Sequence, residues 1–187
     1  TLPEPAAENS LGANKALIID TTPSTVSSVS ATTSDGYYNA GDTIAVTVTF
    51  NESVTVSGTP QLTLETGETD ATADYASGSG TATLTFNYIV ASGHTSSDLD
   101  YASTTALALN SGTIKDAGGN DATRTLPTPG ADNSLSANKA LVIDNTAPTI
   151  TPPSEGSSTE DLDYQNVTTT LIISWTAGSD ATAGIEK

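Results

Sequence analysis

The sequence predicts an all-β protein with the architecture of an antiparallel β-sandwich. Two long segments alternate apolar and polar residues, and shorter apolar runs are separated by turn-forming residues. No segment sustains the 3.6-residue apolar period of an amphipathic helix, so we expect little helix. Together these patterns are typical of two packed layers of strands around one core.

The two longest predicted strands cover residues 43–50 and 81–90. Each places its apolar residues on one face, which predicts half-buried strands, and we expect the two to lie in opposite sheets. The inward residues are Ile44, Val46, Val48 and Phe50 in the first strand and Ala82, Leu84, Phe86, Tyr88 and Val90 in the second.

Shorter apolar runs complete about eight predicted strands, and turn signals such as SDG, ETGE, NSG and AGGN separate them. These runs are residues 26–29, 54–56, 62–64, 71–75, 107–109 and 141–143.

An internal repeat defines the predicted module boundaries. TLPEPAAENSLGANKALIID at residues 1–20 recurs as TLPTPGADNSLSANKALVID at 125–144, with all but positions 4, 6, 8, 12 and 18 identical. The offset is 125 − 1 = 124 residues, the size of a domain, which predicts tandem modules. We therefore expect residues 1–20 to be the tail of a preceding module and residues 21–144 to be a complete one.

The remaining residues, 145–187, are expected to open a further module. Apolar residues alternate through VTTTLIISW, which predicts two opening strands with Trp175 in the core. Because the chain starts at Thr1 and has no methionine, we also expect it to be a piece of a longer protein.

Composition restricts the possible partners. The net charge is −17, with only 5 Lys and Arg residues, so a phosphate backbone would be repelled and nucleic acid is excluded as a partner. The carboxylates are explained either by divalent ions, calcium above all, or by a solvated acidic surface that keeps a secreted protein soluble. No cysteine is present for disulfides, and no run of about 18 apolar residues predicts a membrane span.

Four segments carry a family resemblance: SDGYYNAGDTIAVTVTFNESVTVSGTPQLTLETG, GSGTATLTFNYIVASGHTSSDLDY, GTIKDAGGNDA and NKALVIDNTAPTI. Together they resemble the Ig-like repeats of giant bacterial surface proteins and adhesins, and the resemblance covers residues 21–150. SEGSS and LIISWTAGSDATAGIEK near the end are similar to the opening of a fibronectin type III module. The resemblance implies an Ig-like sandwich in an extracellular or cell-surface stalk, whose linkers frequently hold calcium.

In such a sandwich, the linker residue Asp20 should lie beside the loop after the strand 43–50 and the loop in KDAGGND. Calcium takes six to eight oxygen ligands, and we expect Asp20, Glu52, Asp116 and Asn120 to supply them. Turn hydrogen bonds made by Asp and Asn without a metal are the alternative. An analogous site one module later would use Asp144 and Asp180, and the reserve ligands are Asp35, Asp42, Asp98 and Asp100.

Three function classes follow: a structural spacer of a bacterial adhesin, a module that binds glycan or ice, and an accessory domain of an enzyme. Tyr37 and Tyr38, predicted in a loop, are the candidate glycan contacts. The only histidine, His94, is expected to face solvent, and no nucleophile motif accompanies it, so we do not expect an enzyme. The expected partners are neighbouring modules of the same chain and a glycan or cell-surface ligand, with the protein monomeric in solution.

Overall fold

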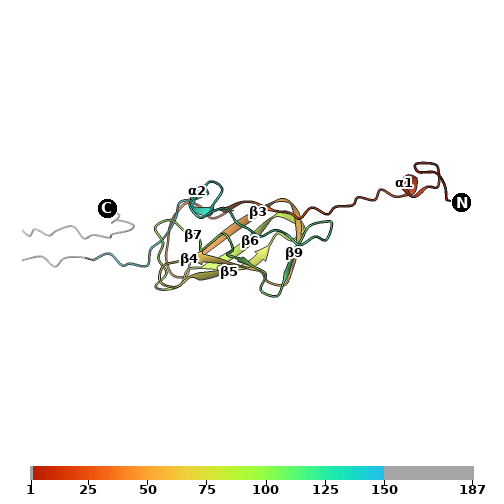
Figure 1. The fold of residues 1–187 in the computed structure, drawn as a ribbon. Helices are drawn as coiled ribbons and strands as arrows, with labels where there is room; N and C mark the ends of the chain where they lie inside the picture. The colour runs from red at the N-terminus through yellow and green to blue at the C-terminus, as the bar shows by residue number, and fades with distance from the viewer. Residues whose placement is uncertain (1, 150–187) are drawn as a thin grey trace, which may run out of the picture.

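The computed structural model describes residues 2–149, and it is an all-β sandwich built mostly from antiparallel pairs (Figure 1). The predictions for the part beyond residue 149, including Trp175 and Asp180, lie outside the described residues. The strands are β1 (Val26–Ala31), β2 (Gly36–Tyr38), β3 (Thr43–Ser57), β4 (Gln61–Glu65), β5 (Ala71–Ser77), β6 (Thr81–Ile89), β7 (Asp100–Tyr101), β8 (Leu107–Ala108), β9 (Thr113–Lys115) and β10 (Leu141–Ile143). Two one-turn helices are α1 (Leu11–Asn14) and α2 (Leu135–Asn138).

The main sheet has the order β1-β3-β6-β5-β4-β7, with β8 beside β4 and β9 beside β3. β10 pairs in parallel with β2, and the two form a separate small sheet. Their pairing joins residues about a hundred positions apart in the chain, so the end of the module is closed by a non-local contact.

The predicted apolar faces of β3 and β6 are confirmed as core except at Ala82, which is only half-buried at the start of β6. Ile44, Val46 and Val48 are fully buried, as are Leu84 and Phe86. The expectation that these strands belong to opposite sheets is wrong, because β3 and β6 are hydrogen-bonded antiparallel neighbours. Alternation determines which face of a strand is buried, whereas the choice of neighbour depends on hydrogen bonding across the chain.

β3 also joins two predicted strands into one. Residues 43–50 and 54–56 were expected as separate strands with a loop between them, but the strand runs unbroken to Ser57. Its pairing with β6 shifts register between Thr49 and Val54, and its last part pairs with β9 instead. Glu52 therefore lies within a strand and not in a loop.

Several short elements were not predicted, because each is too short to show periodicity. β2 contains Tyr37 and Tyr38, which corrects their expected place in a loop. The helices α1 and α2 occupy equivalent places in the two copies of the repeat, and each is N-capped by a serine side chain, Ser10 or Ser134.

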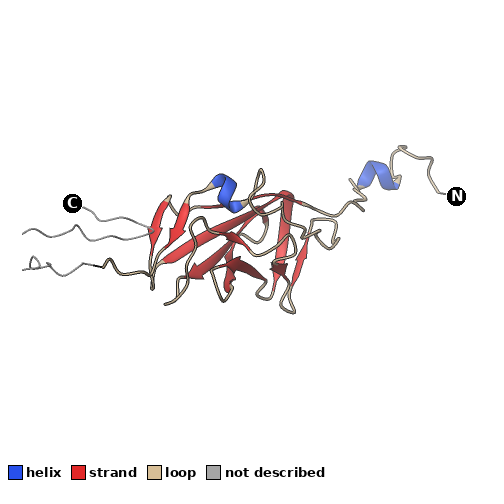
Figure 2. Cartoon of the chain, turned by 60° about the vertical axis from the view of Figure 1, so that its left-hand side comes forward, coloured by secondary structure: helices blue, strands red, loops and turns tan. Residues whose placement is uncertain are grey.

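The chain enters and leaves the sandwich at opposite ends (Figures 1 and 2). Residues 20–24 lead in beside β9, and the segment after β10, the strand that pairs with β2, leads out at the opposite end. The N-terminal segment with α1 extends away from the sandwich. None of the helices among residues 2–149 has the length and hydropathy needed to cross a membrane.

Candidate functional site

The N-terminal junction brings together three of the predicted calcium ligands. The Asn120 side-chain amide donates to the Asp20 carbonyl oxygen at 3.2 Å and to Oδ2 of Asp116 at 3.0 Å. Gly118 lies against the same linker, because a Cβ at this position would be 2.9 Å from the Asp20 carbonyl oxygen. Asn120 and Gly118 thus hold the linker against the turn that follows β9.

Asp116 is the buried carboxylate of this junction, with 4% of its surface exposed. Burial raises its pKa, but hydrogen bonds from the Asn120 side chain and from the backbone N–H groups of Asn120, Gly118 and Ser24 outweigh burial and lower it overall. The ionised carboxylate therefore organises the turn through protein donors. Nearby, the Ser24 hydroxyl is buried without a hydrogen-bond partner among the described residues.

Glu52 does not join this cluster. It is half-buried in β3 and makes no hydrogen bond or ion pair with Asp20, Asp116 or Asn120. Its neighbour Asn51 instead accepts the backbone N–H of Thr25 at 2.8 Å. Within residues 2–149, no group of three or more Asp, Glu, His or Cys side chains is placed to hold a metal ion.

Asp116 makes the junction sensitive to acid. Because its folded pKa lies below the ordinary 3.8, its stabilising effect is complete above about pH 4 and is lost as pH falls through the lower folded value. In urea unfolding from about pH 7 to about pH 2, the stability difference between the wild type and Asp116→Asn should stay constant and then shrink below about pH 4. A difference that does not shrink in acid would contradict this assignment, and Asp132→Asn, at an exposed position, is the control.

The C-terminal junction is held by Asn145 rather than by the predicted Asp144. Asn145 accepts the Ala40 N–H at 2.7 Å and donates to the carbonyl oxygens of Ala91 and His94 at 3.2 and 2.7 Å. The Asp144 carboxylate caps a local turn by accepting the Thr146 N–H at 2.9 Å.

Asp20 makes the same turn at the other end of the module, where it accepts the Thr22 N–H at 3.0 Å. Both predicted linker aspartates thus form turn hydrogen bonds of the kind that needs no metal. Asp180, the expected partner of Asp144, lies outside the described residues.

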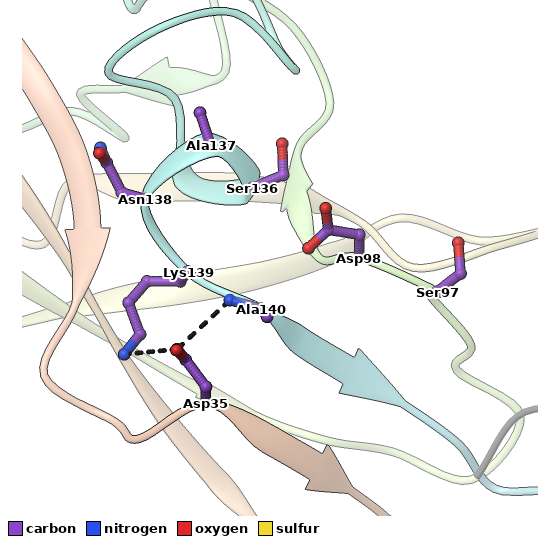
Figure 3. A pocket seen from close by; sticks show the side chains of 8 residues that line it. All are labelled: Asp35, Ser97, Asp98, Ser136, Ala137, Asn138, Lys139 and Ala140. Carbon is purple, nitrogen blue, oxygen red and sulfur yellow. Dashed lines mark hydrogen bonds and ion pairs between the residues drawn. The ribbon is translucent and has the colours of Figure 1, made fainter.

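Two of the reserve ligands, Asp35 and Asp98, line a surface pocket of about 470 Å³ (Figure 3). The pocket is formed by the residue before β2, by α2 and the two residues after it, and by the segment before β7. Asp35 pairs with Lys139 at 2.6 Å, and the hydrogen bond from Lys139 is the main reason why the pKa of Asp35 is lowered. Across the pocket, burial and then the charge of Asp100 raise the pKa of Asp98.

The other two reserve ligands have local partners. Asp42 accepts the Asn39 N–H in a turn at 2.9 Å. Asp100 is buried and accepts hydrogen bonds from Gly130 N–H at 2.9 Å and Ser136 Oγ at 2.7 Å. Asp100 therefore fastens the second copy of the repeat to β7.

The aromatic candidates differ from their predicted surroundings. Tyr37 is 58% exposed, whereas Tyr38 is half-buried against the core and donates to the Ser34 carbonyl oxygen. His94 is half-buried and not simply solvent-facing, since its Nδ1 lies 2.8 Å from the Tyr88 hydroxyl and the two rings stack. Burial raises the pKa of Tyr88 to about 12.

The two copies of the repeat lie in opposite environments, a contrast that sequence reasoning missed although the repeat itself signalled it. Leu141 and Ile143 of the second copy are fully buried, while their equivalents Leu17 and Ile19 are 67% and 91% exposed. Leu2 and Leu11 are likewise exposed, and their equivalents in the second copy, Leu126 and Leu135, are buried. The first copy therefore carries the apolar pattern of a core segment without a core around it.

Comparison of the chain with protein-family models, with curated proteins and with solved structures finds no match.

Proposed function

We propose that the chain is a spacer unit of a tandem-repeat protein of the bacterial cell surface, of the adhesin stalk type, and that it has no catalytic role. The observation that carries this proposal is that the repeated segment is exposed in its first copy and buried in its second copy. Residues 5–14 have the same turn and the same serine-capped one-turn helix as residues 129–138, whereas residues 17–19 are not paired as a strand like their equivalents in β10. The exposed leucines and isoleucines of residues 2–19 are those of a segment that belongs to a preceding module.

The position of the chain ends supports a linear array. Because the chain enters at one end of the sandwich and leaves at the other, successive modules would be placed end to end (Figure 1). Asn120 at one junction and Asn145 at the other tie the linkers to neighbouring turns. These hydrogen bonds limit bending between neighbouring modules, and a rigid spacer needs such a restriction. The acidic surface adds repulsion between neighbouring units.

Concatemers of residues 21–144 test the spacer directly. β3 has 15 residues, which at about 3.3 Å each gives a unit length of roughly 50 Å. Small-angle X-ray scattering of two, three and four units should therefore show a maximum dimension that rises linearly, by roughly 50 Å per unit. Growth with about the square root of the unit number would indicate a flexible chain and would overturn the rigid spacer.

Calcium at the Asp20 junction is part of the same proposal. It is supported by the convergence of the Asp20 carbonyl oxygen, the Asp116 carboxylate and the Asn120 side chain, which are oxygen-bearing groups of the type that calcium binds. These three residues supply only part of a set of six to eight oxygens, and Asn120 would have to turn its amide oxygen toward the ion.

Thermal unfolding with calcium and with a chelator tests this part. At a free calcium concentration about 100 times Kd, linkage predicts about 2.7 kcal/mol of stabilisation. We expect a higher Tm in calcium, with the calcium-dependent difference abolished in Asp116→Asn, which removes the carboxylate of the cluster, and retained in the control Asp132→Asn. An equal Tm in calcium and in chelator would remove calcium from the proposal and leave the Asn120 contact as the means of fixing the linker.

A further inference from the structure

The second copy of the repeat, residues 125–144, closes the module through contacts with several elements. Its α2 lies beside β1, where Asn138 donates to the Val29 carbonyl oxygen at 2.8 Å and the Val29 N–H donates to Asn133 at 2.8 Å. Near its start, the Tyr101 hydroxyl donates to the Pro127 carbonyl oxygen at 2.7 Å. The segment is thus a long ligand seated on the rest of the module, which we term the acceptor surface (residues 24–124).

The last part of the segment is bound on both sides. β10 pairs in parallel with β2, with Ile143 opposite Tyr38. On its other edge, Ile143 and Ser96 exchange two backbone hydrogen bonds of 2.8 and 3.0 Å, and the Leu99 N–H donates to Leu141 at 2.8 Å. Most of these bonds use the backbone of the segment, so any segment with the same fold and apolar pattern can make them.

Residues 2–19 match the apolar pattern of the second copy position by position, and they share its turn and one-turn helix. The buried residues of the second copy, Leu126, Ser134, Leu135, Leu141 and Ile143, are all identical in the first copy. Asn133, Asn138 and Lys139, which contact β1 and Asp35, are identical as well. The five positions that differ are exposed or half-buried in the second copy: Thr128, Gly130, Asp132, Ser136 and Val142. Of the side-chain hydrogen bonds and ion pairs between the second copy and the acceptor surface, only the hydrogen bond from Ser136 to Asp100 is lost, because the equivalent residue Gly12 has no hydroxyl.

We propose that residues 2–19 of one copy of this chain dock on the acceptor surface of a second copy, in place of residues 126–143. The occupant is thus a second copy of the same chain, and it would bury apolar side chains that are exposed in the single chain. This interaction goes beyond the spacer function and does not depend on it, because it follows from the matching of the two segments alone.

The geometry makes the exchange intermolecular and open-ended. To lie as residues 126–144 do, residues 2–20 must end beyond β2, but Asp20 is tied to Asn120 beside β9, at the opposite end of the sandwich. Thr21–Pro23 can span at most about 10 Å, far less than the length of β3. The segment therefore reaches a second copy and not its own acceptor surface. Such head-to-tail contacts are heterologous and generate chains rather than closed dimers.

In the intact chain, residues 125–144 compete with residues 2–19 of a second copy for the acceptor surface. They do so from within the same molecule, and therefore at a high effective concentration. We therefore expect the wild type to be mostly monomeric and the exchange to emerge when its own segment is weakened. The full chain with Leu141→Asp and Ile143→Asp places charges at fully buried positions and should release the segment.

The first test is light scattering after size-exclusion chromatography of this double variant over a hundredfold concentration range. We expect a series of oligomers that grows with concentration. Adding Leu17→Asp and Ile19→Asp should return the protein to a monomer, because the donor segment then carries the same charges. Oligomers that persist in the quadruple variant would reveal nonspecific aggregation and would overturn the proposal.

A disulfide trap tests the register and also works if the double variant does not fold. The chain has no cysteine, and hydrogen-bonded antiparallel partners such as Ser96 and Ile143 have Cα atoms about 5.5 Å apart, within the range of disulfides. Ser96→Cys with Ile19→Cys should form disulfide-linked multimers, both in the double variant and in otherwise wild-type chain refolded at high concentration.

The matched control is Ser96→Cys with Glu8→Cys. The equivalent of Glu8 in the second copy is Asp132, which is exposed and is not a pairing partner of Ser96. We expect at least tenfold more multimer on non-reducing gels for the Ile19 pair than for the Glu8 pair. Equal amounts for the two pairs in both preparations would mean that residues 2–19 do not dock in this register.

Discussion

Replacing Leu141 with alanine should lower the free energy of unfolding by about 2–5 kcal/mol, the range for large-to-small changes in a core. Leu141 is fully buried in β10, where it closes the end of the sandwich against β2 and the segment before β7. Urea unfolding followed by circular dichroism measures the change, with the midpoint and the slope fitted separately.

The repeat provides a matched control, because Leu17 is the same residue in the same local sequence. It is 67% exposed, and Leu17→Ala should change the free energy of unfolding by less than about 0.5 kcal/mol. Equal losses for Leu17→Ala and Leu141→Ala would mean that the first copy is also packed in solution. That result at low protein concentration would contradict the exposed N-terminal segment on which the proposed docking depends.

Replacing Asp100 with alanine should lower the free energy of unfolding by about 2–3 kcal/mol, because three hydrogen bonds to a buried charged acceptor are lost. The Asp100 carboxylate accepts the N–H groups of Gly130 and Tyr101, both at 2.9 Å, and the Ser136 hydroxyl. It is 8% exposed, so water cannot readily replace it. The same urea titration at neutral pH measures the loss.

Asp98 is the control for Asp100, since it lies two residues away and is exposed. Burial and the nearby Asp100 charge raise the pKa of Asp98, so its ionised form gains nothing from its surroundings. Asp98→Ala should therefore change stability by less than about 0.5 kcal/mol. A loss from Asp100→Ala no larger than that from Asp98→Ala would show that Asp100 does not fasten residues 125–144 to β7.

The alternation of apolar and polar residues in the sequence predicted the strands in which every second side chain is buried. The alternation in β3 and β6 identified their core faces, because a strand turns successive side chains to opposite faces whatever its neighbours are. The same reasoning could not choose the neighbours, so it placed β3 and β6 in different sheets. It also divided β3 at Asn51, Glu52 and Ser53, three consecutive polar residues that interrupt the alternation, and so placed Glu52 in a loop.

The candidate site was predicted in part for a similar reason. Asp20, Asp116 and Asn120 were expected together from the resemblance to an Ig-like sandwich, and the structure brings them together. That the Asn120 amide lies between the two aspartates depends on the close approach of Gly118 to the linker, a contact between residues about a hundred positions apart. Tyr37 and Tyr38 form a strand only because β10 supplies its partner.

By itself, the sequence determined the β-rich class, the core-facing residues of the long strands, the acidic surface and the presence of a repeated segment. Only the tertiary structure decided which copy of that segment is buried, because nearly identical residues at 1–20 and 125–144 form the same local turn and helix in both places. Local interactions are the same in the two copies. The burial of Leu141 against the exposure of Leu17 depends on the surface that each segment meets, and that surface is formed by residues distant in the chain.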